Sequence, residues 1–538
     1  MSKRTKDKNI YKINKDRLRL FFLFSKYELL IDINFKSAKI VLVKKTNTIY
    51  KRGVYMIEID PLIDYSKEQR RAIAFIDMKS FYASVECVEM GLNPLTTSLC
   101  VMSGADNSAG LILASSPTFK KVFGKSNVGR SRDLPFNMHN RKFNYSNYYR
   151  TAPRDWLNKV APPSKSNVAF IESWAKRTKI VPPRMSKYIE KNIEIQHVIQ
   201  NFASPEDIFW YSIDEGFVDL TSSLNYFYDK SLPAEVKLDK LSRKIQLAIL
   251  KKTGIYSTVG MSIGNPLLAK LALDNEAKHN TNMRAFWAYE NIPDKVWKIK
   301  SLTDFWGINT RTEKRLNKLG IKSVYDLAHC SPALLKKEFG IVGVQLFFHA
   351  NGIDESTVYE PYNAKSKSIG NSQVLPKDYV DQTQIELVIK EMTEQVSIRL
   401  RKAKKQTTVV SLYVGYAYSE NKKSLHAQKK IEVTNSIAVL SDHIISLFRA
   451  GYSGGSVRRI GVSFSGLCTE EVKLISLFDT FDKKAAKTEI LQGAIDEIRS
   501  QYGFLALQKA TSLLDGSRVV ARSKLVGGHS AGGLDGLT

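Results

Sequence analysis

Three acidic residues in apolar, strand-forming surroundings are the residues of this sequence best suited to chemistry. Asp77 ends the apolar run Ala72 to Ile76, which predicts a buried strand, and Asp214 and Glu215 stand side by side between two further apolar runs. A carboxylate in such surroundings costs free energy unless a cation or hydrogen bonds compensate it, and adjacent carboxylates repel each other. The pattern favours a site for a hard divalent cation. A helix-capping Asp77 and a solvated turn at residues 214–215 are the alternatives.

Three carboxylates that meet at strand ends form the apparatus of two-metal phosphoryl transfer. One metal ion lowers the pKa of an attacking hydroxyl, and the second holds the triphosphate and the leaving group. Carboxylate oxygens suit Mg²⁺, which shares its octahedral shell with substrate phosphates. We therefore expect two Mg²⁺ ions as cofactors, with Mn²⁺ as a substitute.

The elements that must position these residues follow from hydrophobic periodicity. Residues 208–220 predict a strand, a turn and a second strand, residues 236–252 predict a helix, and residues 258–263 predict another strand. Asn265 and Pro266 predict the N-cap and the first residue of the next helix. Further on, short helices are followed by a strand-rich stretch around two helices, which indicates a separate module. The 538 residues therefore predict an α+β protein of several domains.

Charge is the most informative bulk property. The chain holds 81 Lys and Arg against 53 Asp and Glu, a net charge of +28, and its first 54 residues hold 15 basic and 4 acidic side chains. The remaining excess is spread over the body, which favours a long surface that follows nucleic-acid phosphates. No apolar run is long enough to span a membrane, and four scattered cysteines predict neither disulfides nor a zinc cluster. We expect a cytoplasmic protein without a membrane partner.

Three long motifs in series resemble those of the Y-family translesion DNA polymerases. They are Phe75-Ile-Asp-Met-Lys-Ser-Phe-Tyr-Ala-Ser-Val-Glu86, Tyr211-Ser-Ile-Asp-Glu-Gly-Phe-Val-Asp-Leu220 and Thr258-Val-Gly-Met-Ser-Ile-Gly-Asn-Pro-Leu-Leu-Ala-Lys-Leu-Ala272. The nearest resemblance is to the catalytic subunit of the bacterial error-prone SOS polymerase, in the form found in Gram-positive bacteria, their plasmids and phages. The resemblance implies a right-hand polymerase with palm, fingers, thumb and little-finger domains.

The implied domain boundaries follow these motifs. Residues 1–54 form a basic N-terminal extension, either disordered or not native. The remaining divisions are the palm (55–92 and 201–295), the fingers with an insertion (93–200), the thumb with a helix-hairpin-helix (296–360), the little finger (361–470) and a C-terminal tail with a clamp-binding motif (471–538).

The resemblance also assigns roles around the reacting centre. The implied metal ligands are the side chains of Asp77, Asp214 and Glu215 and the backbone carbonyl of Met78. Tyr82 is the implied steric gate, whose ring occupies the place of the ribose 2′-OH that distinguishes RNA precursors from DNA precursors. Phe81 is implied to pack beside it, under the sugar.

The implied triphosphate contacts include a departure from the family. Lys278 matches the family's basic residue that contacts the incoming dNTP, and Lys121 is the candidate for a role that an Arg usually fills. Lys binds phosphate as a point charge rather than as a fork. Lys79 stands where the family usually has Asp or Asn, and a cation so close to a metal site weakens metal binding unless its side chain points away.

Two segments resemble the family's DNA-binding elements, and a third resembles its clamp-docking peptide. Trp306 to Ile321 resembles the thumb hairpin, with Asn309 where a Gly is usual. The candidate DNA-binding residues are Asn309, Arg311, Lys314, Arg399, Arg401, Lys402, Lys404 and Lys405. The candidate clamp-binding residues are Leu474, Ile475, Leu477 and Phe478.

The leading hypothesis is a template-directed DNA polymerase that adds dNTPs to a primer 3′-OH during damage tolerance and SOS mutagenesis. One alternative is a non-catalytic DNA- or clamp-binding factor that blocks replication, with Lys79 having disabled the metal site. The other is a nucleotidyl cyclase-like enzyme with a similar palm. The expected partners are primer-template DNA, dNTP and the sliding clamp, together with an SOS accessory subunit and a recombinase filament.

Overall fold

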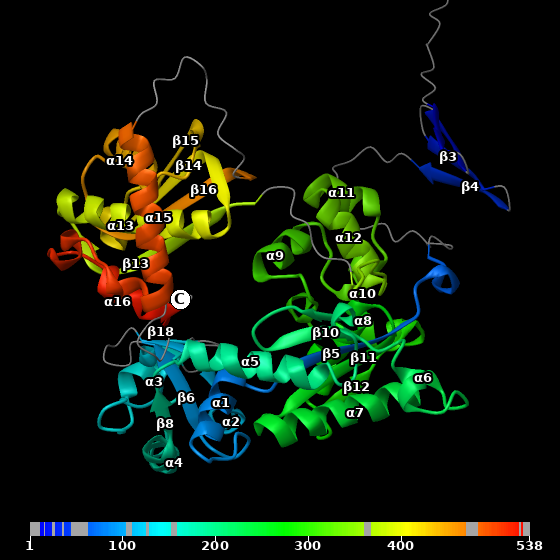
Figure 1. The fold of residues 1–538 in the computed structure, drawn as a ribbon. Helices are drawn as coiled ribbons and strands as arrows, with labels where there is room; N and C mark the ends of the chain where they lie inside the picture. The colour runs from blue at the N-terminus through cyan, green and yellow to red at the C-terminus, as the bar shows by residue number, and fades with distance from the viewer. Residues whose placement is uncertain are drawn as a thin grey trace, which may run out of the picture.

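The computed structural model describes residues 11–14, 17–23, 27–34, 37–44, 63–103, 110–124, 129–151, 159–359, 367–469, 483–526 and 529–530. Figure 1 shows a body that contains the predicted palm, fingers and thumb, and a second α+β body formed by the C-terminal part of the chain.

A five-stranded sheet lies at the centre of the first body. Its strands are, in spatial order, β12 (Arg284–Phe286), β11 (Ser257–Gly264), β5 (Arg71–Met78), β10 (Glu215–Asp219) and β9 (Ile208–Trp210). Side chains alternate between the two faces of a strand. In β5, Ala72, Ala74 and Ile76 pack in the core that contains helix α7 (Ala234–Thr253), whereas Ile73 and Phe75 pack against helix α8 (Pro266–Ala272).

The predicted elements around this sheet are confirmed, with small shifts of their ends. Asp77 lies within β5 rather than after it. The Asn265 side chain accepts a hydrogen bond from the Leu268 N–H at 3.0 Å, as expected of an N-cap, and Pro266 is the first residue of α8. The helix then continues as a π-helical turn, Leu273–Ala277. Two further helices, α1 (Phe81–Glu89) and α6 (Leu224–Phe227), complete this region.

The predicted fingers contain more regular structure than the sequence indicates. Strands β7 (Leu111–Ser115), β6 (Leu99–Ser103) and β8 (Lys179–Val181) form a three-stranded sheet in that order. The helices are α2 (Pro117–Phe123), α3 (Tyr145–Thr151), α4 (Lys165–Arg177) and α5 (Met185–Ile199). The predicted fingers have a hydrophobic core of their own, which contains Phe119, Phe136 and Ala175. Helix α5 instead buries Tyr188 and Ile195 in the core of the central sheet.

The predicted thumb is a cluster of short helices, as expected. They are α9 (Thr310–Lys318), α10 (Val324–Ala328), α11 (Pro332–Phe339) and α12 (Ile341–Ala350). Asn309 has an extended backbone, with φ −95° and ψ 172°, and its side chain caps α9 by accepting hydrogen bonds from the Arg311 and Thr312 N–H groups. The residues of this segment with positive φ are Gly307, at φ 92°, and Gly320, at φ 85°.

The second body is a four-stranded antiparallel sheet covered on one face by two helices. The strand order is β13 (Ile369–Tyr379), β16 (Val457–Thr469), β14 (Lys405–Tyr416) and β15 (Leu425–Thr434), and the helices are α13 (Gln382–Lys402) and α14 (Ile437–Gly451). Apolar side chains of both helices and of alternate strand positions form its core. This confirms the predicted α+β module.

Part of the predicted C-terminal tail is folded onto this second body. Helix α15 (Lys483–Tyr502) and helix α16 (Val519–Ser523) lie beside α13, followed by the short strands β17 (Leu525–Val526) and β18 (His529–Ser530). Ion pairs join the two parts: Asp496 with Arg401 at 2.6 Å, Arg499 with Glu394 at 2.9 Å, and Arg522 with Glu391 at 2.6 Å. The clamp-like residues 474–478 lie outside the described residues.

Four antiparallel strands lie within the N-terminal extension, for which the sequence indicated no domain. They are β1 (Tyr11–Asn14), β2 (Arg17–Leu23), β3 (Tyr27–Asn34) and β4 (Ser37–Lys44), paired in chain order. In the described part of the chain, every helix is too short or too polar to cross a membrane.

Candidate active site

The pairing of β5 with β10 brings two of the predicted metal ligands together. Asp77 is opposite Glu215 in the antiparallel register, two positions from the pair formed by Phe75 and Phe217. Residues two apart on a strand share a face, so both carboxylates lie on the face covered by α8. The Asp77 and Glu215 side chains are 15% and 19% exposed, which leaves them open to a small ligand.

Asp214 completes the carboxylate group from the turn between β9 and β10. Its backbone carbonyl accepts a hydrogen bond of 2.8 Å from the N–H of Met78, so the ends of the two segments lie against each other. The Ser212 hydroxyl donates to the Asp214 carboxylate at 3.0 Å. Burial, followed by the neighbouring carboxylates of Asp77 and Glu215, raises the pKa of Asp214 to about 6, although the hydrogen bond from Ser212 opposes this shift. The three predicted ligands therefore repel one another.

Two lysines from α8 and the π-helical turn partly compensate this repulsion. The Lys270 ammonium lies 2.9 Å from Glu215 and 3.4 Å from Asp274, and 4.3 Å from the centre of the Phe75 ring. The Lys278 ammonium lies 2.9 Å from Asp77 and 2.8 Å from Asp274. Burial lowers the pKa of Lys278, but the carboxylates of Asp77 and Asp274 outweigh it, so the net shift is upward. Lys270 was not predicted from the sequence.

The donor set suits Mg²⁺, and two of its three carboxylates are paired with lysines. Among the described residues, no three His, Cys, Asp or Glu side chains already surround one point as ligands. The ammonium groups of Lys270 and Lys278 lie next to Glu215 and Asp77 and offset part of the negative charge of these carboxylates. Carboxylates that repel each other and are met by cations are suited to a hard divalent ion. The backbone of Met78, the fourth predicted ligand, lies at the end of β5 beside them.

Two further lysines approach this site from other elements. Lys79 follows β5, and burial is the main cause that lowers its pKa, with Lys278 lowering it and Asp77 raising it. Lys120, on α2, donates to the Ser80 hydroxyl at 3.1 Å, and its pKa is lowered mainly by burial and then by Lys79 and Lys278. Lys121 is the residue that the sequence predicted to contact the triphosphate in place of the family's Arg. It lies exposed on α2.

The predicted gate residues lie at the start of α1. Phe81 is buried and Tyr82 half-buried, with their ring centres 5.8 Å apart. Burial raises the pKa of Tyr82, and so does the nearby Asp214 carboxylate. The Tyr82 side chain therefore lies near the Asp214 carboxylate.

Some of the predicted DNA-binding side chains are exposed, whereas others form hydrogen bonds within the protein. Arg311 and Lys314 lie on α9 just beyond the Asn309 cap. In the second body, Lys402 and Lys404 are exposed, whereas Arg401 forms hydrogen bonds of 2.6 and 3.1 Å to Asp496. The two other candidates make contacts within the sheet: Arg399 donates to the Gly370 carbonyl at 3.0 Å and Lys405 to the Thr469 hydroxyl at 3.1 Å.

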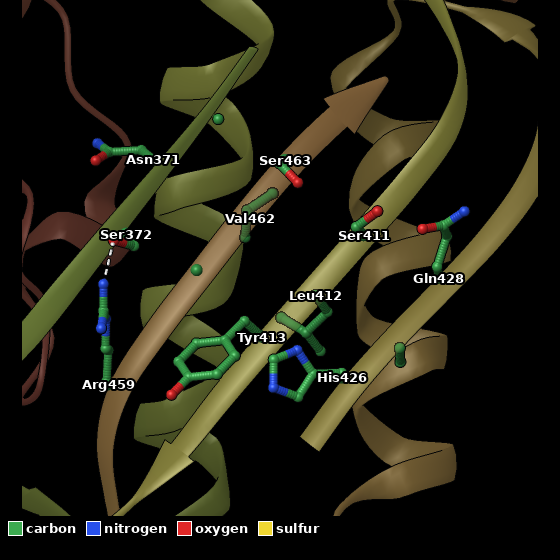
Figure 2. A pocket seen from close by; sticks show the side chains of 13 residues that line it. Asn371, Ser372, Ser411, Leu412, Tyr413, His426, Gln428, Arg459, Val462 and Ser463 are labelled. Carbon is green, nitrogen blue, oxygen red and sulfur yellow. Dashed lines mark hydrogen bonds between the residues drawn. The ribbon is translucent and has the colours of Figure 1, made fainter. Parts of the chain in front are cut away.

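The open face of the second sheet is a surface that sequence analysis missed. Figure 2 shows its side chains standing in front of the strands with the helices behind. Arg459 donates to the Ser372 hydroxyl at 3.2 Å and lies 5.5 Å from the centre of the Tyr413 ring. His426, Gln428 and the small side chains Ser411 and Ser463 complete a shallow, polar hollow. The strand alternation in the sequence could have indicated this polar face, but not that helices cover only the other one.

Comparisons with known proteins agree with this arrangement. The model of the impB/mucB/samB family matches residues 164–274, and that of its C-terminal domain matches residues 366–477. The putative UV-damage repair protein UvrX of Bacillus subtilis (strain 168) is 34% identical over 87% of this chain and 100% of its own length. DNA polymerase IV 2 of the same organism is 30% identical over 86% of this chain and 99% of its own.

A solved structure shows the same fold. A Y-family DNA polymerase chimera superposes with a TM-score of 0.51 at 21% identity, over 74% of this chain and 99% of its own. That fold has palm, fingers, thumb and little-finger domains, as the sequence motifs imply. From relatives that match over nearly their whole length and from this shared fold, it follows that the chain belongs to the impB/mucB/samB family of Y-family DNA polymerases.

Proposed function

We infer that the protein is a template-directed DNA polymerase of the translesion type, which adds dNTPs to a primer 3′-OH. The observation that carries this inference is the convergence of Asp77, Asp214 and Glu215 at one end of the central sheet, beside Tyr82. The comparisons support it and do not favour a cyclase or a non-catalytic binding factor. We propose that it acts in damage tolerance and SOS mutagenesis.

The three carboxylates and the Met78 carbonyl are the groups that would hold two Mg²⁺ ions. When bound, Mg²⁺ activates the primer hydroxyl and neutralises charge on the triphosphate. The protein's own contribution is positional. The β5–β10 register fixes Asp77 against Glu215, and the hydrogen bond between Met78 and Asp214 fixes the turn beside them. Lys270 and Lys278 pair with Glu215 and Asp77, each at 2.9 Å, and so hold these carboxylates in place.

We propose that three lysines form the triphosphate site. Lys79, Lys120 and Lys278 lie close enough to influence one another's pKa. Like charges gathered in a half-buried place cost free energy unless an anion joins them, and a nucleotide triphosphate is such an anion. Lys79, which replaces an acidic or amide residue of the family, then becomes an additional phosphate contact rather than a defect. Lys120 takes the role that the sequence assigned to Lys121.

Replacing Lys120 by Ala is expected to raise the KM for dNTP about tenfold, because one charge-assisted phosphate contact is lost. Lys121→Ala is the matched control, since it removes the neighbouring, exposed lysine from the same helix, and its KM should change by less than about twofold. Steady-state incorporation of one nucleotide measures both. A larger effect of Lys121→Ala than of Lys120→Ala would return the role to Lys121.

Two surfaces supply the proposed grip on primer-template DNA. One is the N-terminal end of α9, where Arg311 and Lys314 follow the Asn309 cap. The other is the open sheet face of the little finger, where Arg459 and His426 stand among small polar side chains. Contacts of this kind hold the backbone without reading sequence. Lys402 and Lys404 extend the surface, whereas Arg401 is committed to Asp496.

Docking on the sliding clamp through Leu474, Ile475, Leu477 and Phe478 remains part of the proposal, and these residues lie outside the described part of the chain. An SOS accessory subunit and a recombinase filament are proposed as further partners. The chemistry assigned to the carboxylates needs only DNA, dNTP and Mg²⁺, so it can be tested without them.

The test is extension of a labelled primer on a template by the full chain, with dNTPs and Mg²⁺, in the absence and presence of sliding clamp. Extension that EDTA abolishes is the expected result. Salt-sensitive DNA binding without extension in both arms would indicate the binding factor instead. Cyclic nucleotide formation without DNA binding would indicate the cyclase-like enzyme.

A further inference from the structure

One face of helix α5 contacts two parts of the proposed nucleotide site, the gate residues on α1 and the turn that carries Asp214. Arg184 immediately precedes α5, and Tyr188 and Asn192 follow at intervals of four residues, so the three lie on one side of the helix. Helix α5 packs beside α1, which carries the gate residues (Figure 1). This face is buried: Tyr188 is 0% and Asn192 is 7% exposed.

The Tyr188 ring lies flat against the ring of Tyr82. Their centres are 4.3 Å apart and their planes differ by 12°. Tyr188 also meets Phe81 edge-on, with ring centres 6.4 Å apart. Stacked aromatic pairs gain free energy beyond the burial of their area. Tyr188 therefore supports one face of the gate ring.

Tyr188 is itself held at its far end. Its hydroxyl donates to Oε1 of Glu86 at 2.7 Å. The Arg184 guanidinium grips the same carboxylate with two hydrogen bonds, of 3.1 Å to Oε1 and 2.7 Å to Oε2. Glu86 is 2% exposed, whereas the Arg184 side chain is 34% exposed, so the carboxylate is buried and the two parallel bonds fix its orientation. The hydroxyl end of the Tyr188 ring cannot shift sideways without breaking its bond to Glu86.

The same helix also holds the hairpin that carries Asp214. The side-chain amide of Asn192 donates to the carbonyl of Ile213 at 2.6 Å. Ile213 immediately precedes Asp214, so α5 sets the gate and the metal-binding turn relative to each other. This coupling of two parts of the site through one rigid helix is a property of the fold, not of any of the three sequence motifs.

We propose that Tyr188 is a positioning residue for sugar discrimination: it keeps the Tyr82 ring where a ribonucleotide's 2′-OH would have to go. A steric gate excludes ribonucleotides only if its ring stays in place. A ring that can move aside no longer clashes with the 2′-OH. The buried stack, anchored through Glu86 and Arg184, supplies that resistance. This inference rests on the proposed polymerase function and on the gate role of Tyr82.

The experiment compares Tyr188→Leu with Tyr188→Phe in the full chain. Leu keeps the site apolar but removes the stack, and the preference for dNTP over rNTP, as a ratio of kcat/KM values, should fall roughly threefold to tenfold. Phe keeps the stack and loses only the bond to Glu86, so the ratio should stay within about twofold of the parent. If Tyr188→Leu fails to fold, Tyr188→Met, whose flexible side chain fills irregular space, replaces it with the same expectation.

A second pair of measurements tests the role of Tyr188 separately from the proposed polymerase function and from the gate role of Tyr82. In a Tyr82→Ala background, Tyr188→Leu should change the ratio no further, because Tyr188 acts only through the gate ring. An unchanged ratio in Tyr188→Leu, beside a lowered ratio in Tyr82→Ala, overturns the inference and leaves the polymerase intact. If Tyr188→Leu lowers the preference for dNTP over rNTP equally in the Tyr82→Ala background, the inference is also overturned. Failure of the parent protein to extend with dNTP overturns the proposed function instead.

Discussion

Asp214→Asn reduces primer extension by about 10³-fold or more while the protein stays folded and still binds DNA. Asn has the same shape and keeps an oxygen that can accept from the Ser212 hydroxyl, but it loses the negative charge that a Mg²⁺ ion requires. Metal-held phosphoryl transfer supplies several kcal/mol of the rate enhancement, which corresponds to this loss. Single-turnover extension with saturating DNA and dNTP measures the effect.

The stability of the same variant gives an independent readout. The pKa of Asp214 is raised to about 6 in the fold, above its ordinary value, so the folded state tolerates the ionised carboxylate less well than the unfolded chain does, and the ionised form lowers stability at neutral pH. Asp214→Asn should therefore leave the Tm unchanged or raise it. Glu206→Gln, on the exposed turn before the same hairpin, is the control and should retain full extension. Retained extension in Asp214→Asn would remove Asp214 from the metal site.

Tyr82→Ala raises the use of rNTP relative to dNTP by about 10²-fold. The Tyr82 ring lies beside Asp214 and has the Tyr188 ring behind it, so it has no room to retreat from a 2′-OH. Removing the ring opens that space, and discrimination by shape of this kind is worth about 10- to 200-fold. Incorporation of GTP and dGTP opposite the same template base gives the ratio.

The control for this change is Tyr82→Phe, which keeps the ring and loses only the hydroxyl. Its preference for dNTP should stay within about threefold of the parent, because the exclusion is steric rather than a hydrogen bond. If Tyr82→Ala accepts ribonucleotides no better than the parent does, the gate must be another side chain, and the adjacent Phe81 is then the residue to replace.

The sequence by itself predicted the residues of the proposed metal site and determined the local elements that carry them. A buried apolar run before Asp77, a strand-turn-strand around Asp214 and an Asn-Pro start for α8 are short-range patterns, and each was confirmed within a few residues. They are predictable because strand alternation and helix capping depend on neighbours in the chain. The family motifs also identified the chain's fold, which the comparisons confirmed.

Only the tertiary structure decided which side chains meet. Lys120 and Lys121 are neighbours of one type, and the packing of α2 against Ser80 selects the first. Arg401 belongs to a basic run in the sequence. In the structure it forms an ion pair with Asp496 of α15, which is far away in sequence. The support of Tyr82 by Tyr188 depends on how α5 packs beside α1. Such contacts join segments that are distant along the chain, so they depend on how whole elements pack, which local periodicity does not encode.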